Sequence, residues 1–256
     1  MKKICIFNQK GGVGKTTTNI NLCAYLANLG YKILAIDMDP QGNSTSGLGI
    51  DKNLIEKSIY DVITSDTKLS EVIKECKLIS NLSIAPSGME LAGAEVELIG
   101  VQNREHILSD KIEELEEEFD FIFIDCPPSL GLLTINALTA AHSVLIPIQC
   151  EYYALEGLGH LSNTIERVKN SLNKHLKVEG VVMTMYDSRT NLCNQVLKEV
   201  EKYFPNEIFN AKIPRNIRLA EAPSHGLPIM LYDDKCKGAD SYEKLANEFL
   251  KKQKEL

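Results

Sequence analysis

A short glycine-rich segment near the start of the chain constrains its fold more than any other feature. The segment 10–17 reads KGGVGKTT, follows an apolar run at 3–8 and opens an amphipathic stretch at 15–30. Glycines let the backbone turn tightly around an anion, and the N–H groups of the loop and of a helix N-terminus attract negative charge. A strand, a glycine loop and a helix in this order are the context that a phosphate-binding loop requires. We therefore predict a nucleotide-phosphate site made by Lys10, Gly11, Gly12, Val13, Gly14, Lys15, Thr16 and Thr17.

Within this loop, the residue types predict separate tasks. Lys15 would reach the β- and γ-phosphates and so take part in catalysis, and the Thr16 hydroxyl would be a ligand of Mg²⁺. The usual spacing would place a first glycine at position 9, where this chain has Gln9, and a second lysine, Lys10, follows it. The alternative is a glycine turn with solvated lysines, which the agreement of strand, loop and helix disfavours.

Apolar runs of strand length alternate with longer amphipathic stretches along the whole chain. This alternation predicts βαβ units and an α/β fold, in which a doubly wound, mostly parallel sheet carries helices on both faces. We expect a single domain over residues 1–256. The expected strands are 3–8, 32–37, 82–86, 121–125, 143–148 and 178–185, and the expected helices are 15–30, 101–118, 131–141, 155–173, 191–203 and 238–252.

Composition excludes several classes of protein. The seven cysteines form no Cys-x-x-Cys pair, which argues against a disulfide framework or a zinc site and favours buried thiols in a reducing cytoplasm. No apolar run reaches the roughly 18 residues of a membrane span. The net charge is −7, yet residues 161–256 hold 16 basic and 13 acidic side chains. A locally basic face in this part of the chain therefore stays possible.

Six segments together carry a resemblance to a known family. The loop KGGVGKTT resembles the deviant Walker A motif of the ParA/MinD ATPases, a group with the P-loop NTPase type of fold. The segments DMDPQGN at 37–43 and FIFIDCPPS at 121–129 resemble its switch I region and its Walker B and switch II region. Further along, QCEYYALEG at 149–157 and IPRN at 213–216 with APSHG at 222–226 are similar to the short chromosomal ParA subgroup, called Soj.

The resemblance implies a dimer that encloses two ATP molecules and hydrolyses them slowly. Lys10 would cross the dimer interface to the partner's phosphates and act in catalysis, much as an arginine finger does. Asp39 would orient the attacking water. Asp125 would hold Mg²⁺, and Asp37 would support the metal or the loop. Each aspartate follows an apolar strand and could instead cap a turn or a helix.

Further residues follow from the resemblance to the same family. The adenine is expected against Pro214, Arg215 and Asn216, although a Pro-Arg-Asn turn is the plain alternative. Arg189 is expected to contact DNA, and Arg218 adds charge nearby in the sequence. Contacts of this kind reach phosphates, so they would be independent of base sequence and sensitive to salt.

The resulting functional prediction is an ATPase for chromosome or plasmid partitioning, cytoplasmic and associated with the nucleoid. Its cofactors would be ATP and Mg²⁺. Its partners would be a second copy of the chain, non-specific double-stranded DNA and a ParB-type centromere-binding protein that stimulates hydrolysis, with no membrane. Two alternatives remain: a MinD-like membrane-positioning ATPase, and a metabolic enzyme on the same scaffold.

Overall fold

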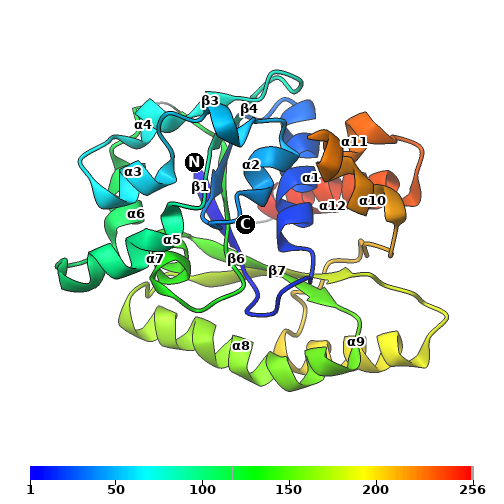
Figure 1. Cartoon of the computed structure of the whole chain (residues 1–256). Helices are drawn as coiled ribbons and strands as arrows, with labels where there is room; N and C mark the ends of the chain where they lie inside the picture. Colours follow the sequence, from blue (N-terminus) through cyan, green and yellow to red (C-terminus); the bar gives the residue numbers. More distant parts are fainter. Residues whose placement is uncertain (117, 255–256) are drawn as a thin grey trace.

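A seven-stranded sheet forms the centre of the molecule, with helices on both of its faces (Figure 1). The computed structural model describes residues 1–116 and 118–254, and the side chains of all of these except 152–156. The strands lie in the order β3-β4-β2-β5-β1-β6-β7, and only β3 runs antiparallel to its neighbour. The bounds are β1 (Lys2–Ile6), β2 (Ile33–Asp37), β3 (Lys74–Glu75), β4 (Leu82–Ala85), β5 (Phe121–Asp125), β6 (Ser143–Gln149) and β7 (Lys177–Thr184).

Alternating side chains on each central strand supply two separate cores. In β1, Cys5 belongs to one apolar cluster, here called the first cluster, and Ile4 and Ile6 belong to the other, the second cluster. All three side chains are fully buried. A strand covered on both faces has no polar side, which explains its nearly continuous apolar sequence. The same reasoning applies to β5, where Ile122 and Ile124 face the first cluster.

The helices divide between these two clusters. The second cluster is covered by the first helix and the C-terminal ones: α1 (Lys15–Asn28), α10 (Ile217–Glu221), α11 (Ile229–Tyr232) and α12 (Lys237–Lys254). The short helix α2 (Asn43–Gly47) packs against α1. The first cluster is covered by α3 (Ile59–Thr64), α4 (Leu69–Val72), α5 (Leu91–Glu97), α6 (Ile107–Glu113), α7 (Leu132–Ala140), α8 (Tyr152–Ser171) and α9 (Asn191–Tyr203). Short 3₁₀ turns span Lys52–Leu54, Leu98–Gly100 and Ala222–His225. Within the described residues, no helix is both long and apolar enough to cross a bilayer.

The predicted α/β class and the mostly parallel sheet are confirmed. Each of the six expected strands is present, with ends that differ by at most two residues. The expected helix at 101–118 is wrong in extent, because α6 covers only Ile107–Glu113; Asn103 has a positive φ of 54°, which a helix does not accept, and residue 117 lies outside the described residues. The edge strand β3 and the short helices α2 to α5, α10 and α11 were not expected.

Gly180 in β7 gives a test of this packing. A Cβ there would lie 2.3 Å from Phe209 Cε2 and 2.9 Å from the backbone oxygen of Glu207. We expect Gly180→Ala to lower the free energy of unfolding by about 1–3 kcal/mol, because the chain at 207–209, including the buried Phe209, must move. Denaturant unfolding measures this change.

Gly159→Ala in α8 is the matched control. Its Cβ would meet only the Tyr203 hydroxyl at 3.6 Å, an ordinary contact. A helical alanine there should leave stability equal or higher. Equal stability of both variants would contradict the packing described for β7.

Candidate functional site

The glycine loop lies between β1 and α1, and hydrogen bonds connect this segment to β6 and β7. Gly12 and Gly14 have φ angles of 76° and 89°, which a residue with a Cβ rarely adopts. The Thr184 hydroxyl at the end of β7 donates to the carbonyl of Val13 at 2.8 Å. The Asn8 amide donates to the carbonyl of Pro147 at 2.8 Å, within β6. These contacts anchor the loop to β7 and Asn8, which precedes it, to β6, and the N-terminus of α1 opens directly onto the loop.

Lys15 places a buried cation inside this loop. Only 6% of the residue is exposed, and its Nζ donates to the carbonyl of Lys10 at 3.1 Å. Burial lowers the pKa of the Lys15 ammonium, and the nearby Asp125 carboxyl opposes that shift. A cation that has already lost most of its water is well suited to bind a phosphate oxygen.

Lys10, the second lysine of the loop, lies half-exposed at its outer edge. Its ammonium forms an ion pair with Glu151, the residue that precedes α8. The sequence offered no reason to expect this partner. Lys10 is therefore held by its own protomer in this structure.

Asp125 ends β5 in the middle of the sheet and is fully buried. Its Oδ2 accepts a hydrogen bond from the Ser44 hydroxyl at 2.8 Å, whereas its Oδ1 is buried with no hydrogen-bond partner. Burial raises the pKa of this carboxyl to about 7, and the neighbouring Asp37 adds to the shift, whereas the Ser44 hydrogen bond and the nearby Thr16 hydroxyl oppose it. An unpartnered buried oxygen beside a threonine hydroxyl fits a Mg²⁺ site, because such sites commonly combine one carboxylate with phosphates and waters.

Asp37 lies directly beside Asp125, because β2 and β5 pair in the register Asp37↔Asp125. Its Oδ2 accepts from the backbone N–H and the hydroxyl of Thr45, at 2.8 and 2.7 Å, and its Oδ1 accepts from the backbone N–H of Asp39 at 3.2 Å. Both oxygens thus bind the loop 39–45. Of the two tasks predicted for Asp37, support of the loop has contacts in this structure, and metal binding stays a prediction.

Asp39 lies two residues beyond the end of β2 and is 7% exposed. Its Oδ1 accepts from the backbone N–H of Gln41 at 2.9 Å, and its carbonyl accepts from the Ser87 hydroxyl at 2.8 Å. The Ser87 backbone N–H in turn donates to the Thr45 hydroxyl at 2.9 Å. The segment after β2 is therefore tied to the end of β4 as well as to Asp37.

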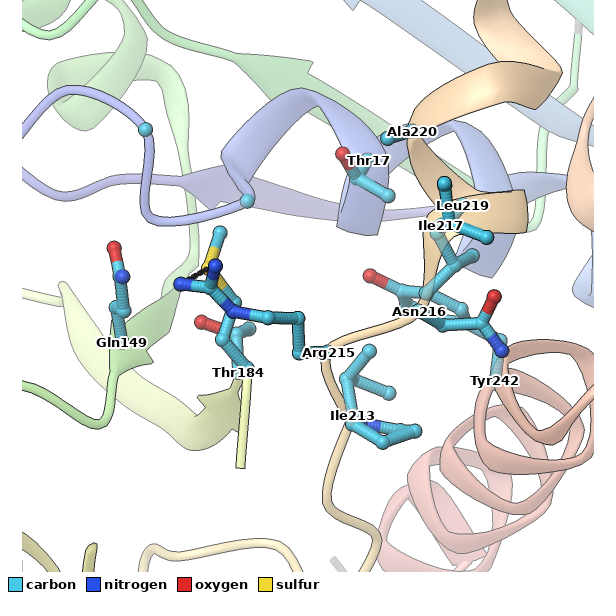
Figure 2. Close-up of a pocket in the computed structure, with 14 residues that line it drawn as sticks. Thr17, Gln149, Thr184, Ile213, Arg215, Asn216, Ile217, Leu219, Ala220 and Tyr242 are labelled. Atoms are coloured by element: carbon cyan, nitrogen blue, oxygen red, sulfur yellow. Dashed lines mark hydrogen bonds between the residues drawn. The ribbon is translucent and has the colours of Figure 1, made fainter. Parts of the chain in front are cut away.

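A cavity of about 570 Å³ opens beside the loop, between β7 and α10 (Figure 2). Gly12, Gly14 and Thr17 form its side toward the loop, and the expected adenine residues Pro214, Arg215 and Asn216 line it. Val13, Lys15 and Thr16 are not among its lining residues. The cavity also has lining residues to which the sequence analysis gave no role in the site: Gln149, Thr184, Met185, Ile213, Ile217, Leu219, Ala220 and Tyr242.

The Asn216 side chain both caps a helix and lies at the cavity. Its Oδ1 accepts from the backbone N–H of Arg218 at 2.8 Å and thereby caps α10, which is the turn-forming role weighed for it. The same side chain lines the cavity. Its amide N–H groups still suit the acceptor nitrogens of a purine. Arg215 reaches across the cavity toward Thr184 and lies 3.9 Å from the sulfur of Met185 (Figure 2).

Some of the residues that the sequence reasoning missed had a detectable signal. Gln149 directly follows the predicted strand 143–148, and Thr184 lies one residue before the end of the predicted strand 178–185. Ligands of open α/β sheets bind at the carboxyl ends of strands. Ser44 and Tyr242 had no such signal, because each reaches the site only through the packing of its helix.

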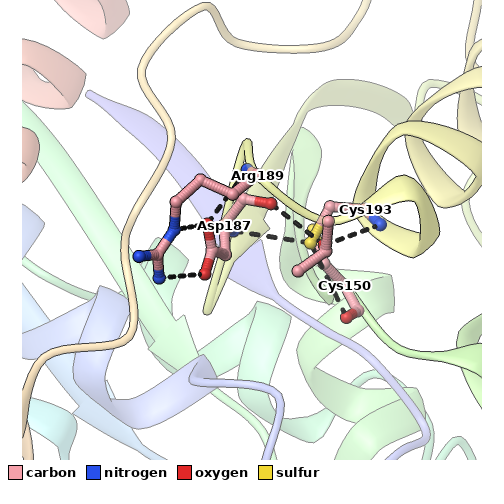
Figure 3. Close-up of polar contacts among 5 residues, drawn as sticks. Cys150, Asp187, Arg189 and Cys193 are labelled. Atoms are coloured by element: carbon pink, nitrogen blue, oxygen red, sulfur yellow. Dashed lines mark hydrogen bonds and ion pairs between the residues drawn. The ribbon is translucent and has the colours of Figure 1, made fainter.

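The two arginines predicted to contact DNA do not line the cavity. Arg189 follows β7, and its side chain is 87% exposed and bound to Asp187 (Figure 3). Arg218 lies in α10, with its Nη1 at 3.0 Å from Glu221 Oε2 and its Nε at 3.4 Å from Asp233 Oδ2.

Comparison with known proteins agrees with this site. Residues 1–178 match the family described as "AAA domain". The chain is 54% identical over 247 residues to the sporulation initiation inhibitor protein Soj of Bacillus subtilis, with 96% of this chain and 97% of that protein covered. It is also 54% identical over 249 residues to the chromosome partitioning protein ParA of Myxococcus xanthus, with 97% and 88% covered. The chain belongs to the ParA/MinD family.

A solved structure shares the fold of this ParA/MinD chain closely. It is the cobyrinic acid a,c-diamide synthase of Mycobacterium smegmatis with bound ADP and magnesium, at a TM-score of 0.85 and 36% identity, with 99% of this chain and 96% of that chain covered. The resemblance inferred from the motifs is thus confirmed over nearly the whole chain.

The buried carboxyls predict how stability depends on pH. Burial raises the folded-state pKa of Asp37 to about 6 and that of Asp125 to about 7, above the usual value near 4. Their contribution to stability is fully present below about pH 4 and is lost as the pH rises through the folded-state values. We expect Asp125→Asn to lessen the loss of unfolding free energy between pH 5 and pH 8, measured in chelator without nucleotide. A loss equal to that of the wild type would contradict this account.

Proposed function

We propose that this chain, acting as one domain, is an ATP-hydrolysing partition protein that binds DNA as an ATP-dependent dimer. The observation that carries this proposal is the meeting of three features at the carboxyl edge of the sheet. They are the rigid glycine loop, the buried ammonium of Lys15 and the unpartnered Oδ1 of Asp125, beside a cavity of about 570 Å³. Relatives named for chromosome partitioning, at 54% identity over nearly the whole chain, support the same function.

ATP would place its phosphates on the glycine loop and its base in the cavity. Lys15 would bind the β- and γ-phosphates, and the loop N–H groups would bind the remaining oxygens. Asn216 would donate its amide N–H to the purine, and Pro214 and Arg215 would line the same end. The ADP and magnesium bound by the Mycobacterium smegmatis structure support this placement of a nucleotide.

Mg²⁺, when bound, would neutralise charge on the β- and γ-phosphates. The Thr16 hydroxyl and the Asp125 Oδ1 would hold it, the latter directly or through water. Ser44 would keep the Asp125 carboxylate oriented through its 2.8 Å hydrogen bond. The described residues contain no group of three or more His, Cys, Asp or Glu side chains that could hold a metal, so the nucleotide itself would complete the ligand set.

Asp39 would position the water that attacks the γ-phosphate. Its backbone is held by Asp37 and Ser87, so its carboxylate needs no contact with the nucleotide to keep its place. Positioning of water and stabilisation of charge supply most of the catalysis in phosphoryl transfer. A single protomer would lack the Lys10 ammonium of a second copy at its phosphates, so the monomer would hydrolyse ATP slowly.

A second copy of the chain would approach the glycine loop closely. A Cβ at Gly11 would meet only Pro128 Cβ at 3.9 Å, and the φ angle of Gly11 is not positive. The protomer itself thus places no demand for glycine at this exposed position, whereas a facing loop would. In this dimer, Lys10 would exchange Glu151 for the phosphates of the other protomer.

Duplex DNA would bind to the edge of the dimer that carries Arg189 and Arg218. The contacts would reach phosphates, and the two-fold dimer would double them, so that binding follows ATP and ignores base sequence. A ParB-type protein would stimulate hydrolysis and release the dimer, and the protein would be found in the cytoplasm on the nucleoid. The membrane alternative is less well supported, because the apolar residues Tyr242, Leu245 and Phe249 of α12 are buried in the core.

Two variants separate binding of ATP from its hydrolysis. Lys15→Ala should weaken ATP binding at least about 100-fold, since a buried charged contact to phosphate is lost. Asp39→Ala should bind ATP and Mg²⁺ like the wild type and hydrolyse it at under about a tenth of the rate. Calorimetry measures the first property and phosphate release the second. Native ATP affinity in a folded Lys15→Ala, or full turnover in Asp39→Ala, would remove the assigned roles.

Arg189→Glu tests the DNA contact. With ATP and Mg²⁺, its affinity for duplexes of any sequence should fall at least about tenfold, while ATP-dependent dimerisation persists, because Arg189 lies outside the cavity. Arg167→Glu, the same charge reversal on the exposed side of α8, is the control and should bind like the wild type. A salt titration of DNA binding by fluorescence anisotropy, with sedimentation in parallel, measures both. Wild-type binding by Arg189→Glu would favour the metabolic or membrane alternative.

A further inference from the structure

Arg189 is held by a carboxylate of its own loop in a two-point contact. Its Nε donates to Asp187 Oδ1 at 2.9 Å and its Nη2 donates to Asp187 Oδ2 at 2.7 Å (Figure 3). The backbone N–H of Arg189 also donates to Asp187 Oδ1, at 3.0 Å. This parallel pair of N–H···O bonds is the arrangement with which arginine also binds a phosphate.

The loop holds Asp187 in place from the other side. The backbone N–H of Asp187 donates to Cys193 Sγ at 3.4 Å, and its carbonyl accepts from the Thr190 hydroxyl at 3.0 Å. Cys193 in turn lies against the carbonyl of Cys150, which follows β6 (Figure 3). The Arg189 side chain is 87% exposed, against 36% for that of Asp187. The backbone of Asp187 is thus held in place, and the guanidinium that its carboxylate binds is largely exposed to solvent.

We propose that Asp187 competes with DNA phosphates for the guanidinium of Arg189 and thereby keeps the affinity of each protomer for duplex DNA low. The inference rests on the proposed function, since it assumes that Arg189 contacts DNA. What it adds is a residue, Asp187, that sets the strength of this contact. Asp187 is acidic, whereas the residues expected to contact DNA are basic.

The competition follows from the geometry of the pair. A phosphate that takes the Nε and Nη2 edge must displace Asp187. A phosphate that takes the remaining Nη1 side binds beside a carboxylate, and the two negative charges repel each other. In either position, the DNA meets an Arg189–Asp187 pair whose net charge is zero. The pair therefore attracts distant phosphates only weakly. The Asp187 carboxyl stays ionised, because Arg189 lowers its pKa to about 2.

Three further basic side chains in residues 212–218 differ in whether their named contacts include a carboxylate. Arg218 forms ion pairs with Glu221 and Asp233. Lys212, by contrast, lies over the Tyr186 ring at 5.4 Å, and Arg215 contacts the sulfur of Met185. Both arginines predicted to contact DNA thus have a carboxylate partner in this structure, which sets a limit on how tightly this acidic protein can hold DNA.

Asp187→Asn is the direct test, in the full chain with a non-hydrolysable ATP analogue and Mg²⁺. An exposed ion pair contributes a factor of about 1.4 to 5 in an equilibrium constant. We expect about threefold tighter DNA binding per protomer and about tenfold per dimer, because two copies of the loop face one duplex. The salt slope should be unchanged, since the number of phosphates contacted is the same. Asp187→Ala, which has no amide to bind Arg189, should bind at least as tightly.

Two controls isolate the mechanism. Glu71→Gln removes the same charge from an exposed pair with Lys57, at 2.6 Å, beside the opposite edge of the sheet, and it should leave DNA affinity unchanged. Asp187→Asn in an Arg189→Ala background should give no gain. A gain there, or an equal gain from Glu71→Gln, would show a general charge effect and overturn the proposal. Unchanged or weaker binding by Asp187→Asn would also overturn it.

The outcome for Arg189→Glu separates this inference from the proposed function. If that variant loses DNA binding while Asp187→Asn binds no tighter, the DNA contact stands and only the competition fails. If Arg189→Glu binds DNA like the wild type, the assumed contact itself is wrong. Dimerisation of every variant, measured by sedimentation with the same analogue, keeps a loss of assembly from being mistaken for a loss of DNA contact.

Discussion

The site depends on two carboxyl groups, Asp37 and Asp125, that are buried side by side at the ends of β2 and β5. Removing a carboxylate from water is costly, and two of them in contact repel each other, so neither could be ionised here without compensating partners. Asp37 obtains three hydrogen bonds from the segment 39–45. Asp125 obtains one from Ser44 and keeps an oxygen unpartnered. The first carboxyl therefore organises the loop, and the second remains able to bind a cation.

This arrangement connects the strands to each other through side chains as well as through the sheet. The Thr45 hydroxyl donates to Asp37 and accepts from the backbone of Ser87, and the Ser87 hydroxyl donates to the carbonyl of Asp39. The segment after β2 is thus bound to the end of β4, its neighbour in the sheet. Asp37, the neighbour of Asp125 in the sheet, is thereby linked to Asp39 twice: directly through the Asp39 backbone N–H, and again through Thr45 and Ser87.

The sequence predicted the sheet well, because strands buried on both faces are nearly all apolar and their ends carry the glycine loop and the aspartates. It did not predict α2 to α5, which are too short to show a helical period, although α3 has a capping box between Ser58 and Asp61. The glycine loop and Asp125 could be found because they follow strands. Glu151 and Asp187 could not be recognised as partners of Lys10 and Arg189, since a lysine or arginine has many acidic neighbours in sequence and only the fold selects one.

Asn216 also links the two ends of the proposed activity. Its side-chain oxygen caps the N-terminus of α10, a helix of five residues, and the same residue lines the cavity. So short a helix has little internal freedom, because it is hardly more than one turn. If Asn216 moves toward a purine, the first turn of α10 must move with it, and Arg218 lies in that turn. If Asn216 contacts the base as proposed, the nucleotide and the surface charge of Arg218 would be coupled through one side chain.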